Sequence, residues 1–299
     1  MDGTGDRFGT MIIKSRDDTK ASITALRKLL ALDGLTRVQR KEMSAELDRL
    51  RKRAEACKQA AAHIDFALND SHNWAVIHGL RLVHNGRVAQ IDHLLIGRFF
   101  DIYVIDSKNL ATTLRLDAHG EFQTRNGSGW KGIQSPVEQN RGHIIVLNQL
   151  IRDGKLTPTR LGLSLNPAFR NWILVNQSCP IPDSPQQEAI IFKMDMLDRQ
   201  LRDFINHASR PDDILSVAKV CSGSTIMDFA CRLVSYHRPA TYDFVQQFGI
   251  ILPQEEPALA ASEREAHVIA GRRTLPPARR VAAKRTTSRL APARDARRT

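Results

Sequence analysis

Val88-Ala89-Gln90-Ile91-Asp92-His93-Leu94-Leu95-Ile96 and Ile102-Tyr103-Val104-Ile105-Asp106-Ser107-Lys108-Asn109 are two apolar runs that each carry an acidic residue. Alternate residues of a β-strand point to the same face, so Asp106 and Lys108 should lie side by side. If the two runs form a hairpin around the short link between them, Asp92 falls opposite Asp106. The stretch therefore predicts two carboxylates and an ammonium group in one small patch of sheet.

Such a patch has the chemistry of a metal site. A second carboxylate opposite Asp106 repels the first, unless a cation lies between them or one of them is protonated. Oxygen ligands suit Mg²⁺ or Mn²⁺ better than zinc. Lys108 would then orient or deprotonate a water molecule, or stabilise charge that develops on a phosphate. The alternative is a plain ion pair between Asp106 and Lys108 at the end of a strand, and the pattern alone leaves both open.

The surrounding pattern predicts a sheet flanked by helices. Asn85-Gly86 is typical of a two-residue hairpin turn, because both residues accept positive φ angles. Pro136 is placed to open a helix that runs to about residue 151. The other expected strands are 74–83, 112–116, 121–124, 172–175 and 189–192, the other expected helices are 195–207, 212–219 and 222–236, and residues 126–130 are expected to form a loop. The fold class predicted is α/β (α+β), a mixed sheet flanked by helices.

Two helices are expected before this sheet. Residues 19–32 form the first, and Thr36 caps the second, which is long. Its apolar positions are spaced by fours and threes, as in a heptad seam: Met43, Leu47, Leu50, Ala54, Cys57, Ala61, Ile64 and Leu68. The seam packs either against the first helix, as an antiparallel hairpin, or against a second copy of the chain as a homodimer.

The composition is that of a globular protein. The chain has 299 residues, of which 42% are hydrophobic and 25% charged. It has no apolar run near the ~20 residues of a membrane helix, and residues 1–7 lack the pattern of a secretory signal. We therefore expect no membrane partner and a cytoplasmic location. Four widely separated cysteines argue against a zinc ribbon or a disulfide framework.

The positive charge is concentrated at the C-terminal end. Residues 271–299 hold ten Lys and Arg residues and one acid, a net charge of +9, so the preceding 270 residues carry +3 of the total +12. Alanine, proline and arginine dominate after Pro253, and this composition predicts a disordered basic tail over 254–299. The tail suits non-specific contact with phosphates. Trp130, with Arg125 and Lys131, is either a second nucleic-acid contact or an ordinary rim tryptophan.

Three blocks of sequence resemble one family. Gln90-Ile91-Asp92-His93, Val104-Ile105-Asp106-Ser107-Lys108-Asn109 and Ser135-Pro136-Val137-Glu138-Gln139-Asn140-Arg141 are similar to motifs of the NERD (nuclease-related) domain. That domain is grouped with the PD-(D/E)xK, restriction-endonuclease-like superfamily. The resemblance spans roughly residues 55–155.

The resemblance implies a restriction-endonuclease-like mixed sheet and a nuclease site. Asp92 and Asp106 would be metal ligands and Lys108 the catalytic lysine. Gln139, with His143 one helical turn later, resembles the helix glutamine that some members place beside the active site. The implied cofactor is Mg²⁺ or Mn²⁺, and the implied partner is nucleic acid, most naturally DNA.

Two features depart from the family pattern. The D/E position is Asp106, whose side chain reaches less far than that of Glu. The Gly-Glu pair that the family carries in the helix before the sheet is absent, and the match falls on Cys57 or Ala61. Glu55 or Asp65 is a substitute for the missing Glu, and Asp65 is the third metal ligand that we predict.

The domain organisation predicted is an N-terminal helical hairpin (1–54), a NERD nuclease-like domain (55–170), strands and helices that pack on it (171–253) and the basic tail (254–299). The function predicted is hydrolysis of DNA phosphodiester bonds by a metal-dependent Asp-Asp-x-Lys site. The alternative is a catalytically degenerate module of the same fold, which binds nucleic acid or assembles with a partner.

Overall fold

The computed structural model describes residues 11–69, 71–109, 114–116, 121–160, 163–181, 190–208 and 220–251. The expected tail (254–299) and the helix expected at 212–219 lie outside these residues. The core is a six-stranded sheet in the order β1-β2-β3-β4-β10-β11. Its strands are β1 (Met11–Lys14), β2 (Trp74–His84), β3 (Arg87–Gly97), β4 (Asp101–Lys108), β10 (Ala168–Val175) and β11 (Ile190–Lys193).

Two tight turns set the antiparallel centre of the sheet. Asn85 and Gly86, with φ angles of 48° and 71°, connect β2 to β3 as the predicted hairpin turn. The link from β3 to β4 turns at Phe100, which has φ 61°. β3 and β4 then pair antiparallel, with Leu94 opposite Val104 and Ile96 opposite Ile102.

The outer strands make the sheet mixed. β1 runs parallel to β2, β10 runs parallel to β4, and β11 runs parallel to β10. Such parallel neighbours need long crossover connections, and helices lie between β1 and β2 and between β4 and β10 along the chain. A mixed sheet flanked by helices and preceded by a helical hairpin is the fold that the sequence predicted.

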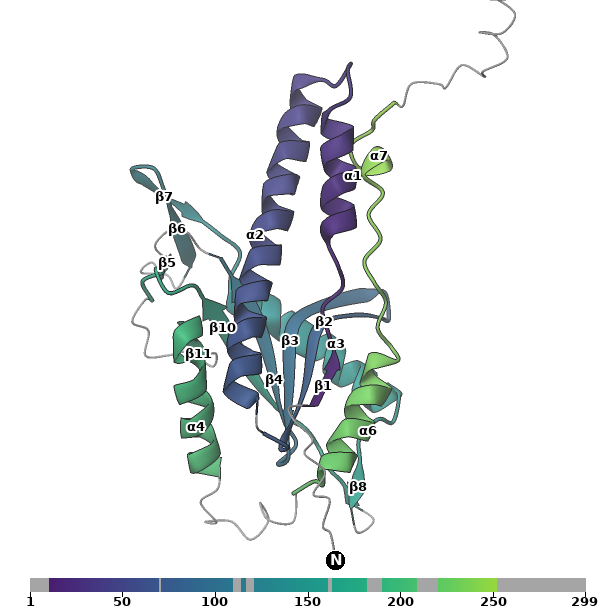
Figure 1. Ribbon diagram of the computed structural model, residues 1–299, viewed down its shortest axis with the longest axis vertical. Helices are drawn as coiled ribbons and strands as arrows, with labels where there is room; N and C mark the ends of the chain where they lie inside the picture. Colours follow the sequence, from purple (N-terminus) through teal and green to yellow (C-terminus); the bar gives the residue numbers. More distant parts are fainter. Residues whose placement is uncertain are drawn as a thin grey trace, which may run out of the picture. The chain divides into compact units, whose positions relative to one another are not determined.

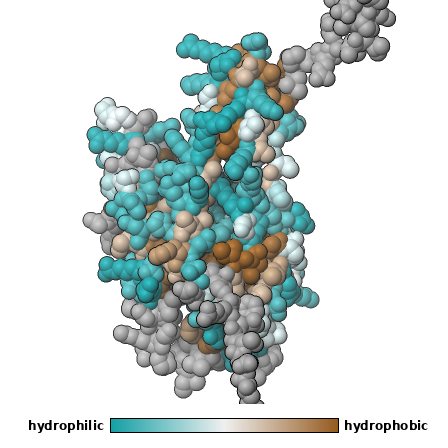
Figure 2. All heavy atoms as spheres, viewed as in Figure 1, coloured by the Kyte–Doolittle hydropathy of each residue, from teal (hydrophilic) through white to brown (hydrophobic). Residues whose placement is uncertain are grey.

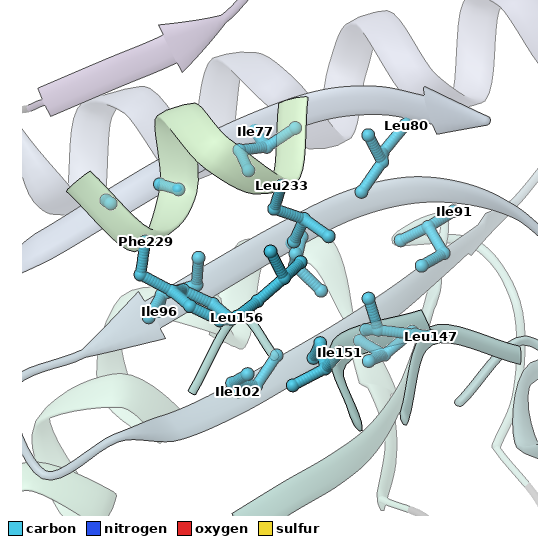
Figure 3. Close-up of a cluster of buried hydrophobic side chains, with 14 of the residues drawn as sticks. Ile77, Leu80, Ile91, Ile96, Ile102, Leu147, Ile151, Leu156, Phe229 and Leu233 are labelled. Atoms are coloured by element: carbon cyan, nitrogen blue, oxygen red, sulfur yellow. The ribbon is translucent and has the colours of Figure 1, made fainter. Parts of the chain in front are cut away.

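One face of the sheet is covered by α3 (Pro136–Asp153) and α6 (Gly223–Val234). Side chains of both helices pack with those of β2, β3 and β4 in one buried cluster (Figure 3). Its labelled members are Ile77, Leu80, Ile91, Ile96, Ile102, Leu147, Ile151, Leu156, Phe229 and Leu233. Burial of this cluster fixes α3, and with it Gln139, against the sheet.

The opposite face is covered by α2 (Arg37–Leu68) and α4 (Leu197–Ala208), which follows the short 3₁₀ helix η1 (Met194–Met196). Small residues of α2 allow close approach to the strands: Ala56 and Ala60 are fully buried beside Tyr103, Ile105 and Trp172. The C-terminal half of α2, which contains Ala56 and Ala60 and is called its lower half below, is therefore held at a fixed distance from β4.

The upper half of α2 forms a helical arm with α1 (Lys20–Leu30) and α7 (Phe244–Gln247) (Figure 1). Thr36 and Gln39 form a reciprocal capping box at the start of α2, as expected from Thr36. Met43, Leu47 and Leu50 of the heptad seam are buried against α1 and α7. Figure 2 shows hydrophobic residues gathered where these helices meet. The intramolecular alternative is the one that the structure describes.

A second sheet leaves the core between β4 and α3. It contains β5 (Leu114–Leu116), β6 (Phe122–Asn126) and β7 (Gly129–Gly132) in that order. The strands expected at 112–116 and 121–124 are confirmed as β5 and β6, which pair antiparallel with Leu114 opposite Thr124. The predicted loop over 126–130 is wrong, because Gly127 (φ 60°) and residue 128 make a two-residue turn into β7. A glycine-rich segment suits a tight hairpin as well as it suits a loop.

The remaining strands, β8 (Thr159–Arg160) and β9 (Leu163–Ser164), form a small hairpin after α3. None of the described helices is both long and apolar enough to cross a lipid bilayer.

Candidate active site

The site lies where the pairing of β3 and β4 ends. His93 and Ile105 are the last pair of the antiparallel ladder, and the next position in this register is Asp92 opposite Asp106. There the carboxylate of Asp92 enters the ladder: Oδ2 accepts hydrogen bonds from the Ser107 backbone N (3.1 Å) and Oγ (3.0 Å). The side chain thus replaces a backbone acceptor, which fixes its position on the strands.

Asp106, Lys108 and Gln139 form a chain of direct contacts. Lys108 Nζ lies 2.8 Å from Asp106 Oδ2 and donates a hydrogen bond to Gln139 Oε1 at 2.9 Å. Asp106 and Lys108 are two residues apart on β4, on the face that α3 covers, as their spacing predicted. The ammonium is therefore held between the central sheet and the first turns of α3.

Arg53 of α2 neutralises Asp92. Its Nη2 lies 2.8 Å from Asp92 Oδ1, while the Asp92 side chain is only 4% exposed. Burial opposes the charge on Arg53, but Asp92 raises the pKa of the guanidinium above its ordinary value. Both oxygens of Asp92 are consequently engaged by protein donors.

The two acids differ in proton affinity. Burial alone would raise the pKa of Asp92, but Arg53 and the hydrogen bonds hold it well below its usual range. Burial raises the pKa of Asp106 to about 6, with Lys108 lowering it and the charge of Asp92 raising it. Asp92 therefore stays ionised more readily than Asp106, and the charge of each acid affects the pKa of the other.

Cys57 occupies the helix position that faces the acids. Ser107 Oγ, which donates to Asp92, lies 3.2 Å from Cys57 Sγ, and burial raises the pKa of this thiol to about 12. Of the two positions matched to the missing Gly-Glu pair, Cys57 is the one that contacts the site. Glu55 points elsewhere and accepts a hydrogen bond from Gln59 on the exposed side of α2.

Asp65 takes part in a different network. Its Oδ1 lies 3.1 Å from His78 Nε2, and His78 Nδ1 lies 2.7 Å from His93 Nδ1. Burial lowers the pKa of both histidines, that of His93 to about 3. A neutral His78 donates to Asp65 and accepts from His93. His93 therefore packs on the α2 side as a hydrogen-bonding residue, and its Nε2 has no partner among the described residues.

Gly79 allows an unusual backbone conformation beside Asp92. It has φ 68° and lies opposite Asp92 in the β2–β3 register, between His78 opposite His93 and Leu80 opposite Ile91. His78 faces α2, yet Leu80 is buried in the cluster on the α3 and α6 side. Side chains of β2 and β3 therefore do not alternate regularly between the two faces of the sheet at Gly79 and Asp92.

Two asparagine amides, of which Asn140 is buried, fix the start of α3. Asn140 is fully buried, and its Nδ2 donates to the Val104 carbonyl oxygen and to Asn171 Oδ1, both at 2.8 Å. Asn171 Nδ2 donates to the Val137 carbonyl oxygen at 3.1 Å. One turn after Gln139, the pKa of His143 is lowered by burial, with Asp92 acting against that shift. α3 thus brings Gln139 to Lys108 and places His143 where it senses the charge of Asp92.

Asp106 offers the kind of oxygen that Mg²⁺ or Mn²⁺ would need, whereas both oxygens of Asp92 already accept from Arg53 or Ser107. Asp106 Oδ2 is a buried oxygen whose contact with Lys108 is not aligned as a hydrogen bond, so it lacks a directional donor. Carboxylate oxygens are the ligands these ions prefer. Within the described residues no three His, Cys, Asp or Glu side chains are grouped to hold a metal ion. Asp65 therefore does not join Asp92 and Asp106, and water or phosphate oxygens would complete the shell.

The sequence prediction missed Arg53. One signal was present: Arg53 is four residues before Cys57, on the same face of the helix. A buried acid such as Asp92 also requires a counter-charge, but nothing in the sequence indicates which cation supplies it. Ser107 was missed for a similar reason, because its role depends on where the ladder ends.

Comparison with known proteins gives one match. Residues 52–166 match the family model of NERD, the nuclease-related domain. No curated protein and no solved structure matches the chain significantly. The match contains all three motifs that carry the resemblance and the elements from the lower half of α2 to α3. Over residues 52–166 the chain is therefore similar to the nuclease-related domain.

Proposed function

We propose that the protein is a Mg²⁺- or Mn²⁺-dependent nuclease that hydrolyses DNA phosphodiester bonds at Asp92, Asp106 and Lys108. One observation carries the proposal: two buried carboxylates and an ammonium converge at the end of the β3–β4 pair, inside the region that matches a nuclease-related domain. Asp92 and Asp106 would hold the ion. When bound, it supplies the positive charge that acidifies water and neutralises phosphate.

Lys108 has the geometry of a positioning and charge-stabilising group. An ammonium has three N–H donors. One donates to Gln139 Oε1, and the group lies 2.8 Å from Asp106 Oδ2 without an aligned hydrogen bond. A further donor would serve an attacking water or a phosphate oxygen. Charge that develops on phosphate is stabilised most where donors are fixed before the reaction, and Asp106 and Gln139 fix this one.

Gln139 and Asn140 support the site from α3. Gln139 accepts from Lys108 and so orients the ammonium. Asn140 ties α3 to β4 through the carbonyl of Val104.

We also place the protein in the cytoplasm as part of this proposal, because its four cysteines are free thiols and reduced thiols are typical of that compartment.

A second function is favoured by Arg53 and Cys57. Arg53 already neutralises Asp92, and Cys57 stands where a third carboxylate was expected. In such a site the protein's own cations, and not a metal ion, neutralise the two acids. A nuclease fold that had lost catalysis and only bound nucleic acid would have a site of this kind. In that case the protein would bind DNA equally in Mg²⁺ and in EDTA and cut it in neither.

Cleavage of supercoiled plasmid tests the proposal. We expect wild type to nick the plasmid with Mg²⁺ or Mn²⁺ and not with EDTA. Lys108→Met should lower the rate by at least about 100-fold, as expected for loss of a group that stabilises developing charge. Lys41→Met is the matched control, because Lys41 is exposed on α2. Equal cutting by wild type and Lys108→Met would contradict the proposed site.

A further inference from the structure

Four polar and aromatic side chains lie together on one face of the second sheet. Arg115 of β5 pairs across the strands with Gln123, and Arg125 of β6 pairs with Trp130 of β7. The Arg115 guanidinium lies 3.9 Å from the centre of the Trp130 ring. Its Nε and Nη2 donate to Gln123 Oε1 at 3.1 and 2.9 Å. These four side chains therefore share one face, which we call the Trp130 face.

The Trp130 face is exposed and basic. Trp130 is 38% exposed, whereas Trp74 is 6% and Trp172 is 1% exposed. Arg125, on the same face, is also exposed. Lys131 is exposed as well, but it pairs with Thr124 and so points to the opposite face of the sheet. In the described part of this sheet, residues 114–116 and 121–132, the single acidic residue is Glu121, just before β6, against three cations.

The base of the sheet lies beside the active site. β4 ends at Lys108, the second sheet follows, and α3 begins after it at Pro136 and carries Gln139, which contacts Lys108. Leu114 and Phe122 are buried against Val175 of β10, and Val175 is the neighbour of Lys108 in the parallel register. Figure 1 shows β6 and β7 projecting from this end of the central sheet. A strand bound at Lys108 can therefore continue along the second sheet.

We propose that the Trp130 face binds a single-stranded segment of the nucleic acid that the active site cleaves. A base stacks on Trp130, and Arg125 contacts a neighbouring phosphate. This inference rests on the proposed function. An exposed indole next to cations is what an unpaired strand requires, because its bases offer free faces for stacking. A duplex keeps its base faces covered and offers only phosphates to such a surface.

Fluorescence of the metal-free protein tests the proposal. With EDTA present to prevent cleavage, wild type is titrated with a thymidine oligonucleotide, with a duplex of equal length and with inorganic polyphosphate. We expect saturable quenching of tryptophan emission by the oligonucleotide, because Trp130 is exposed while the other two indoles are buried. Duplex and polyphosphate should give little quenching, since neither offers an unpaired base.

Variants separate stacking from charge. We expect Trp130→Ala to weaken oligonucleotide binding about tenfold, measured by anisotropy of a labelled strand, and Trp130→Phe to restore most of it. Arg125→Gln should reduce the slope of log affinity against log salt by about one phosphate contact. Arg199→Gln is the control, because Arg199 is 73% exposed on α4; it should bind as wild type does.

The outcomes distinguish this inference from the proposed function. Oligonucleotide binding that equals wild type in Trp130→Ala, equal quenching by polyphosphate, or no binding at all would overturn it. If wild type cleaves plasmid and Trp130→Ala binds as wild type does, the docking face fails while the nuclease stands. If quenching and its loss in Trp130→Ala are observed without any cleavage, the docking face stands and the nuclease fails.

Discussion

Arg53 places a guanidinium 2.8 Å from a carboxylate that is almost fully buried. A buried charge that loses its partner is strongly destabilised. Arg53→Gln should therefore lower the free energy of unfolding of the metal-free protein by roughly 3 kcal/mol, measured with urea in EDTA. Added Mn²⁺ should recover part of this loss, because a cation at Asp92 replaces the missing charge.

Arg51→Gln is the matched control for that experiment. Arg51 lies on the same helix and makes only an exposed contact of 3.8 Å with Asp48, so its loss should change stability by less than about 0.5 kcal/mol. Equal effects of the two substitutions would mean that Arg53 is not the partner on which Asp92 depends.

Asp106 gives the protein a defined pH dependence. Its pKa is about 6 in the folded chain against an ordinary value of 3.8, so the folded state holds the proton more tightly. The stability that Asp106 contributes is present below about pH 4 and is lost as the pH rises through about 6. Asp106→Asn cannot lose a proton at this position. The free energy of unfolding of this variant, relative to wild type, should therefore increase by about 1–3 kcal/mol as the pH rises from about 4 to above about 6.

Urea unfolding at about pH 4.5 and about pH 7.5 in EDTA checks this sign. Asp228→Asn, an exposed acid on α6, should show no growing difference from wild type. A stability difference for Asp106→Asn that shrinks with rising pH would contradict the assignment of the raised pKa to Asp106.

Among single residues, the sequence predicted the partner of Asp106 but not the partner of Asp92. The spacing of Asp106 and Lys108 within one strand is a local property, so their contact followed directly from the pattern. Arg53 meets Asp92 only because α2 packs on the far side of the sheet, 39 residues earlier in the chain. Sequence alone gives no distance between those elements.

Within the helices and strands, Gly79 and Gly142 lead to opposite predictions. A Cβ on Gly79 would lie 3.0 Å from Arg16 Cγ at φ 68°, so Gly79→Ala should destabilise the protein by about 1–2 kcal/mol. Gly142, inside α3, has open space where a Cβ would lie. Gly142→Ala should stabilise the helix by about 0.5–1 kcal/mol.

Thermal or urea unfolding of the two variants compares these glycines directly. Gly79→Ala should also slow plasmid cleavage, because Gly79 lies opposite Asp92. If both substitutions stabilise the protein, Gly79 is not a strained position, and the irregular alternation of side chains at Asp92 needs another cause.

Elements with local signals were predicted well. Asn85-Gly86, the cap at Thr36 and Pro136 each determine a turn or helix start within a few residues. β7 was missed because its turn and its strand are both built from small residues, which also suit a loop. The order of β10 beside β4 was beyond prediction, because parallel pairing depends on packing across a long stretch of intervening chain.

For the whole molecule, the arm of α1, α2 and α7 decides how the heptad seam is used. Met43, Leu47 and Leu50 are buried within the chain, and Phe244 of α7 packs with them. We therefore expect the melting temperature to stay constant over a roughly 100-fold range of protein concentration, since only a subunit interface makes it concentration-dependent. A melting temperature that rises with concentration would instead support a homodimer.

Asp92 and Asp106 are proposed to hold one divalent cation together, and Mn²⁺ binding measured by isothermal titration calorimetry is the decisive test. We expect one site in wild type, at least about tenfold weaker binding in both Asp92→Asn and Asp106→Asn, and unchanged binding in Asp65→Asn, because Asp65 bonds to His78. Absence of Mn²⁺ binding in wild type, or binding that survives both substitutions, would contradict the proposed metal site.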